Sequence, residues 1–212
     1  MPKKVYTSIG YAELAELSPD SNYSTRTTAF VTSGPESRLK RACVVTDVSA
    51  APLPRGCSFS NSMLSVAQKT SLMYGSEYTN DSTDGSLDFE VFLVSGDAVQ
   101  EGEVTWNSRT LSQSWGTGGG DYFTRERGHR NLSPFGYLDG HYLNMRIGRN
   151  LNLSMRTKQR RADFICKFRY EASSSPNKVV GYTDNESTQP TPLLTVYYRK
   201  SSMRSRRLRW AR

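Results

Sequence analysis

Apolar and polar side chains alternate along much of the chain, and this alternation predicts β-strands. In residues 87–93, 164–170 and 194–198 an apolar side chain occupies every second position, with mostly charged or hydroxyl-bearing residues between them. A period of two indicates a strand that turns one face to the core and the other to solvent. Runs of aliphatic, aromatic and β-branched residues predict four further strands, at 5–8, 27–32, 39–46 and 59–72.

Clusters of turn-forming residues separate these strands, and no internal repeat or linker divides the chain. Regularly spaced turns between roughly eight to eleven short strands are typical of a sandwich of two β-sheets. The pattern therefore predicts an all-β, two-sheet, jelly-roll-like sandwich over residues 1–199, with at most one or two short helices. The turn clusters rich in Ser, Pro, Asp, Asn and Gly lie at 18–22, 33–37, 52–56, 80–85 and 173–177.

Two segments carry a pattern that also fits a helix. Residues 11–17 read Tyr-Ala-Glu-Leu-Ala-Glu-Leu, which suits a short helix of at most about two turns. Residues 143–158 fit either one helix or two strands. Because Gly148 lies between the two halves, we expect a strand followed by a short helix there.

Positive charge is concentrated at the C-terminal end. The formal net charge is +8, and residues 199–212 contain seven basic residues and no acidic one, which leaves about +1 for residues 1–198. We therefore expect residues 200–212 to be a tail that docks on an acidic partner, since arginine binds carboxylates and phosphates through paired hydrogen bonds. The partner-binding residues of this tail are Arg204, Arg206, Arg207, Leu208, Arg209, Trp210 and Arg212.

Catalytic and cofactor motifs are weak throughout the sequence. His129 and His141 have no cysteine or carboxylate at metal-ligand spacing. Gly118–Gly120 lacks the Lys-Ser/Thr pair of a phosphate-binding loop. Residues 80–85 resemble half of a calcium loop, but Val91 stands where the bidentate glutamate belongs, so a solvated turn is favoured over a calcium ion held by another geometry. We expect a binding protein without enzymatic activity, cofactor or metal.

The three cysteines and the N-terminal residues bear on where the protein folds. Cys43, Cys57 and Cys166 form an odd set without a CxxC pair, so we favour three reduced thiols over one disulfide. No stretch approaches the roughly eighteen apolar residues of a membrane span. The charged start, with Lys3 and Lys4, lacks the apolar run of a secretion signal. These features predict folding in a cytoplasm, away from membranes.

A tryptophan- and glycine-containing motif in the middle of the chain resembles a known family. Val104–Asn107, Trp115 and Gly118–Tyr122 follow one another as in the "VTWN…W…GGDY" signature of the DNRLRE family of β-sandwich domains. The likeness covers roughly residues 4–199, although Thr46 stands where the family has phenylalanine. Other segments agree in order and spacing, namely 18–23, 41–56 and 164–198.

This resemblance implies a jelly-roll-like sandwich related to carbohydrate-binding modules. Such domains occur on bacterial and archaeal surface proteins and among bacteriophage virion proteins. Without a secretion signal and with a basic tail, the chain fits the second setting better. We therefore expect a multi-copy virion structural protein of the head, collar, tail or fibre base. It would assemble in the host cytoplasm and bind other virion proteins.

Two other functions remain open at this stage. A carbohydrate-binding module would stack exposed aromatic rings on sugars of the host surface, and its candidate residues are Trp106, Trp115, Tyr122 and Tyr137. For Trp106 and Trp115 we favour packing in the core, since large aromatic side chains dominate sandwich cores. A capsid protein would instead bind nucleic acid through the basic tail, with strongly salt-dependent affinity.

Overall fold

The fold was taken from a computed structural model, and its described residues form strands and turns. The structure describes residues 1–25, 28–33, 39–48, 54, 57–69, 88–131, 142–147, 161–169, 171, 178–183 and 191–200. The tail of residues 201–212, Tyr137, and the segments 70–87 and 148–160 lie outside this set. Within the described ranges, no helix has the length and hydrophobicity that spanning a lipid bilayer requires.

The predicted all-β class is confirmed. The described strands are β1 (Lys3–Thr7), β2 (Gly10–Ala15), β3 (Thr28–Ser33), β4 (Lys40–Val45), β5 (Cys57–Lys69), β6 (Asp88–Val94), β7 (Ser108–Thr110), β8 (Gln113–Ser114), β9 (Tyr122–Asn131), β10 (Tyr142–Ile147), β11 (Phe164–Phe168), β12 (Lys178–Thr183) and β13 (Leu193–Lys200).

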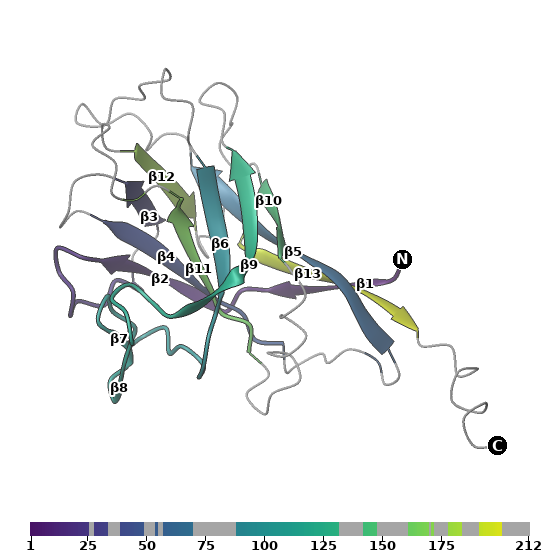
Figure 1. The fold of residues 1–212 in the computed structure, drawn as a ribbon, viewed down its shortest axis with the longest axis horizontal. Helices are drawn as coiled ribbons and strands as arrows, with labels where there is room; N and C mark the ends of the chain where they lie inside the picture. Colours follow the sequence, from purple (N-terminus) through teal and green to yellow (C-terminus); the bar gives the residue numbers. More distant parts are fainter. Residues whose placement is uncertain are drawn as a thin grey trace.

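Eleven strands form one antiparallel hydrogen-bonded network that folds into two sheets, and β7 and β8 form a separate pair (Figure 1). The smaller sheet contains β1, β13, β5 and β10, with β1 pairing β13 and with β13 and β10 both pairing β5. The larger sheet contains β12, β3, β4, β11, β6 and β9, and β2 also pairs β4. The long strand β5 joins the two sheets, because its end pairs with β12 at Gln68 and Lys69.

The main core lies between the two sheets. Phe89, Phe164 and Phe168 are among its largest fully buried side chains, and the rings of Phe89 and Phe168 meet edge to face at 6.1 Å. Leu64 and Met145 of the smaller sheet also belong to this cluster, and neither has any exposed surface. The alternation that predicted strands at 87–93 and 164–170 thus corresponds to side chains that point into this core.

A second cluster lies on the outer face of the larger sheet. Cys43 and Val45 of β4 and Ile165 of β11 point away from the main core, yet they are at most 1% exposed. Residues 95–121, here called the cap, cover them with Val99, Val104 and the two tryptophans Trp106 and Trp115. The central strands of the larger sheet are therefore buried on both faces.

The helical interpretation of residues 11–17 is wrong, because this segment contains β2. All six residues of β2 are buried. Tyr11 joins the main core, whereas Ala12 and Leu14 lie under the cap. Burial on both faces removes the alternation that identifies a strand, so the helix-like spacing was misleading. The strand expected after Leu143 is confirmed as β10, and the helix expected after it falls in residues 148–160, outside the described residues.

All three cysteines are free thiols, as predicted. Cys43 and Cys166 are at most 1% exposed, and burial raises the pKa of both thiols. Cys57 at the start of β5 is half-buried. Because the thiolate is the reactive form, native protein should be alkylated by iodoacetamide at Cys57 alone, and unfolded protein at all three positions. Intact-mass and peptide mass spectrometry would check this; rapid native modification of Cys43 or Cys166 would contradict the burial.

Candidate functional site

The cap carries most of the motif that resembles the DNRLRE signature, and its packing shows what these residues do. Trp106 is 8% exposed and lies over β4 and β11. The Arg41 guanidinium stands over its ring, 5.0 Å from the centroid. A methyl group on Gly119 would come within 2.9 Å of the same ring, and Gly119 has a φ of +77°. Glycine is needed here both for the close approach and for the left-handed backbone.

Trp115 is fixed in the same cap by a hydrogen bond. Its indole Nε1 donates to the Thr105 carbonyl at 3.0 Å, and the ring is 7% exposed. The Arg109 guanidinium stands over this ring at 4.8 Å from the centroid. Each tryptophan therefore has an arginine on its ring, an arrangement that adds a cation–π attraction to the burial of the indole.

Asp121 stabilises the glycine-rich turn through hydrogen bonds to its backbone. Its carboxylate accepts hydrogen bonds from the backbone N–H groups of Gly116 at 2.7 Å and Thr117 at 2.9 Å. Arg109 Nη2 lies 3.2 Å from the same carboxylate. The carboxylate thus stabilises the conformation of the turn 116–121, and its oxygens are occupied by these contacts.

The turn after β2 clamps the cap onto the sandwich. Asn22 Nδ2 donates to the carbonyls of Glu101 at 2.8 Å and Val104 at 2.7 Å. Asn107 Nδ2 donates to Asp20 Oδ1 at 2.9 Å, and the Asn107 N–H donates to the Pro19 carbonyl at 3.1 Å. The early Asn-Tyr turn and the Trp-Asn pair of the resembling motif therefore hold one another in place.

A charged cluster borders the cap at the end of β11. Arg41 forms a bidentate pair with Glu171, with Nε–Oε1 at 2.7 Å and Nη2–Oε2 at 2.8 Å. Lys167 Nζ also lies 2.8 Å from Glu171 Oε2. Arg41 Nη1 donates in addition to the Gly119 carbonyl at 2.9 Å. This arginine therefore connects the outer face of β4, the glycine-rich turn and the carboxylate beyond β11.

The environment of Glu171 favours its charged form. Burial alone would raise the pKa of this carboxyl, but the hydrogen bonds and positive charges of Arg41 and Lys167 outweigh burial and lower the pKa below its ordinary value of 4.5. A carboxylate with a lowered pKa stabilises the fold above that ordinary value and loses this contribution as the pH falls. The cluster is thus a structural ion pair at neutral pH.

The described residues of the glycan-stacking alternative, Trp106, Trp115 and Tyr122, lie in or beside the cap. Trp106 and Trp115 are buried under the cap, with an arginine on each ring, so neither offers a free face to a sugar. Tyr122 is half-buried, with its ring 4.5 Å from that of Phe92. Tyr137 lies outside the described residues. Of the four predicted aromatic residues, the cap brings three together, and it uses them for packing.

Sequence reasoning found the tryptophans and the glycines of this site but missed the ion pair. Arg41 and Glu171 are 130 positions apart. The signal available was Arg41 itself, a charged residue in the predicted strand 39–46 and the first residue of the resembling segment 41–56. Such a residue is almost never fully buried unless it is paired, so its partner could be expected but not identified.

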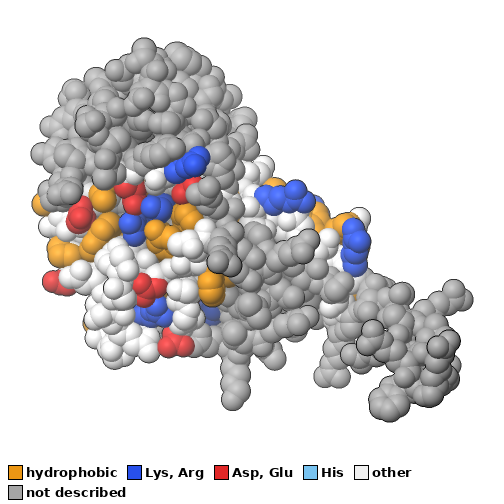
Figure 2. Space-filling view, viewed as in Figure 1, with side chains coloured by type: hydrophobic (Ala, Val, Ile, Leu, Met, Phe, Trp, Pro, Cys, Tyr) orange, Lys and Arg blue, Asp and Glu red, His pale blue; other side chains and the backbone are white. Residues whose placement is uncertain are grey.

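The strands of both sheets carry more basic than acidic residues. The strands of the larger sheet hold seven basic residues and the acidic residues Glu13, Asp88, Glu90 and Glu126, of which Glu13 and Glu90 are buried. The strands of the smaller sheet contain no acidic residue. Their six basic residues are Lys3, Lys4, Lys69, Arg146, Arg199 and Lys200. Figure 2 shows mixed acidic, basic and hydrophobic side chains on the sandwich body, and basic side chains toward the projecting end.

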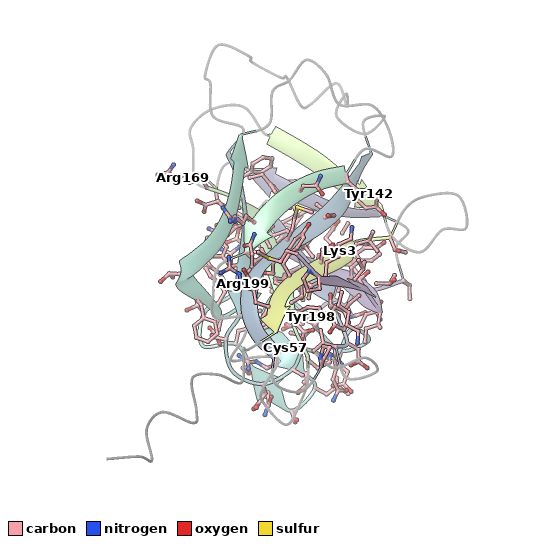
Figure 3. All side chains as sticks on the ribbon, turned by 90° about the vertical axis from the view of Figure 1, so that its right-hand side faces the viewer. Lys3, Cys57, Tyr142, Arg169, Tyr198 and Arg199 are labelled. Carbon is pink, nitrogen blue, oxygen red and sulfur yellow. The ribbon has the colours of Figure 1, made fainter. Side chains whose placement is uncertain are left out.

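Part of the smaller sheet projects from the body of the sandwich as an arm. The arm consists of β1, the first residues of β5 and the last residues of β13, which extend to the right in Figure 1. Figure 3 looks toward its tip, where Lys3, Cys57, Tyr198 and Arg199 come from these three strands. Beyond the pairing of Lys3 with Tyr197, β5 and β13 continue as a two-stranded ribbon to Cys57 and Lys200. The seven basic residues of 199–212 begin on this ribbon.

No protein-family model matches the chain, and no curated protein matches it in sequence. Among the described residues, no three His, Cys, Asp or Glu side chains gather as ligands for a metal ion. On the arm, the basic side chains of Lys3 and Arg199 are exposed.

Proposed function

We propose that the protein is a structural component of a bacteriophage particle, assembled in the host cytoplasm, that acts by docking on other proteins of the particle. The observation that carries the docking role is the charge of the smaller sheet, whose strands hold six basic residues and no acidic one. This sheet leads directly into residues 201–212, which add five arginines. The basic residues of the smaller sheet and of residues 201–212 suit an acidic partner.

The particle setting is supported by the resemblance of residues 104–122 to domains found in phage virion proteins. A rigid sandwich suits such a role, because the cap is held by hydrogen bonds from Asn22 and by the Arg41–Glu171 pair. The glycan-binding alternative is less favoured, since Trp106 and Trp115 have no free ring face. We propose other virion proteins as partners, with many copies of this chain in each particle.

Removing residues 201–212 tests the proposal. Because β13 ends at Lys200, the truncated chain keeps all of its described strands, and its melting temperature should stay close to that of the full chain. Its incorporation into phage particles should fall severely. A matched full-length control replaces the five arginines of the tail by glutamine, which removes charge without changing length.

Three outcomes separate the alternatives. Loss of incorporation for both variants supports docking through charge. Normal incorporation of both variants contradicts it. In the third outcome, the wild-type chain binds DNA in a mobility-shift assay with a steep dependence on salt, and both variants lose this binding but keep normal incorporation. This would favour a nucleic-acid role for the tail instead.

A further inference from the structure

One edge of β1 is unpaired among the described strands. There β1 pairs only with β13, so no described strand lies along its other side. The register shows which backbone groups lie on that side. The Ser8 N–H donates to the Pro192 carbonyl at 2.9 Å, and the Tyr198 N–H donates to the Pro2 carbonyl at 3.1 Å. Even-numbered residues therefore exchange hydrogen bonds with β13, and odd-numbered residues of β1 direct their backbone groups outward.

The outward-directed residues are Lys3, Val5 and Thr7. All three side chains are exposed, and Val5 is 47% exposed at the centre of the strand. An open edge with exposed backbone donors and acceptors is a template for another strand. The even-numbered Tyr6 is buried in the main core, so β1 itself is firmly anchored while its edge stays accessible.

Charge indicates what kind of strand fits this edge. Lys3 and Lys4 lie on β1, and Arg199 and Lys200 lie at the end of the adjacent β13, with no acidic residue on either strand. A second copy of this chain would bring the same cations against them, and lysines on an edge strand are a known protection against such self-pairing. An extended segment rich in aspartate or glutamate would instead be attracted.

We propose that the open edge of β1 binds an extended acidic segment of another protein, which adds to the smaller sheet as a further strand. The backbone groups of Lys3, Val5 and Thr7 provide the hydrogen bonds, and the basic side chains of the arm select the acidic partner. This inference deepens the proposed docking function and rests on it for the identity of the partner. It differs from the proposed function because it assigns the contact to β1 and not to the tail alone.

Purified full-length protein and synthetic peptides test this without a virus. The probe is a short fluorescent peptide in which glutamate alternates with valine, and its binding is measured by fluorescence anisotropy. We expect it to bind the wild-type chain. It should bind Val5→Pro about tenfold more weakly, because proline removes the outward N–H, and one such hydrogen bond corresponds to about that factor in affinity. Since that N–H makes no bond to β13, Val5→Pro should keep its melting temperature, and Val5→Thr is the matched control.

Two further peptides make the result independent of the folding of any variant. The same peptide with lysine in place of glutamate should not bind, and an acidic peptide N-methylated along one backbone edge should bind about tenfold more weakly. Amide protons of Lys3, Val5 and Thr7 should gain protection from exchange when the acidic peptide is added. Equal binding of the N-methylated peptide, or no binding of the acidic peptide, would overturn strand addition.

Double-stranded DNA serves as the competing probe. DNA that displaces the acidic peptide and binds Val5→Pro as well as the wild type would overturn the proposal in favour of a nucleic-acid surface. The incorporation of the chain into phage particles is tested separately from peptide binding. Loss of peptide binding by Val5→Pro, together with absence of the wild-type chain from particles, would keep the edge site and reject the virion role.

Discussion

Replacing Trp106 by alanine should lower the free energy of unfolding by about 3–5 kcal/mol, the usual range for removing a large buried aromatic side chain. The ring is 8% exposed, and it lies close to the Arg41 guanidinium and to Gly118 and Gly119 over the outer face of the larger sheet. Its removal leaves a cavity that the rigid glycine turn cannot fill. Urea denaturation followed by tyrosine fluorescence or circular dichroism measures the change.

The matched control is Leu111→Ala at the tip of the β7–β8 hairpin. Leu111 is 86% exposed in the same cap, so its truncation should change the free energy of unfolding by less than about 0.5 kcal/mol. A loss below about 1 kcal/mol for Trp106→Ala would contradict the packing role. Together with binding of a sugar by the wild-type protein, it would restore the glycan interpretation.

Replacing Arg41 by methionine should also destabilise the protein strongly, by about 3–5 kcal/mol, because it breaks a buried bidentate ion pair and leaves Lys167 as the remaining described cation on the Glu171 carboxylate. The side chains of Arg41 and Glu171 are 9% and 10% exposed. The same substitution removes the hydrogen bond from Arg41 to the Gly119 carbonyl and the cation over Trp106. Chemical denaturation at neutral pH gives the size of the loss.

Lys167→Met is the matched control, because Lys167 contacts the same carboxylate but leaves the pair with Arg41 intact. Its cost should be smaller than that of Arg41→Met, because both hydrogen bonds between Arg41 and Glu171 remain. The pH dependence gives a second test. Glu171 has a lowered pKa, so its contribution is present above about 4.5 and is lost as the pH falls below that value. This acid-dependent loss should be smaller in Arg41→Met; an unchanged pH profile would show that the pair does not stabilise the fold.

The strands with one face in the core could be predicted from the sequence. At 87–93 and 164–170 the apolar side chains alternate because every second residue enters the space between the sheets, as Phe89 and Phe164 do. β2 could not be predicted in this way. Its residues contact the main core on one side and the cap on the other, and Glu13 is buried with its carboxylate 3.0 Å from Lys40 Nζ. Tertiary burial overrode local pattern there.

Some residues of the candidate site could likewise be predicted from the sequence, and others could not. Trp106 and Gly118–Gly120 stood out as a motif, and their roles follow from residue chemistry, since large rings seek burial and glycine allows close approach. Asn22 and Arg41 lie in the resembling segments 18–23 and 41–56, but the groups that they bind did not stand out. Their partners are 79 to 130 positions away, and no local pattern encodes such a distance.

By itself the sequence determined that this chain forms strands and that its C-terminal end is strongly basic, because alternation and charge are local properties. Only the tertiary structure decided that the four strands of the smaller sheet, which carry six basic residues, come together. These strands, at 3–7, 57–69, 142–147 and 193–200, are widely separated along the chain and meet through the antiparallel pairing of β1, β13, β5 and β10. Hydrogen-bonding register, which depends on partners far away in sequence, also decided that Lys3, Val5 and Thr7 face the open edge.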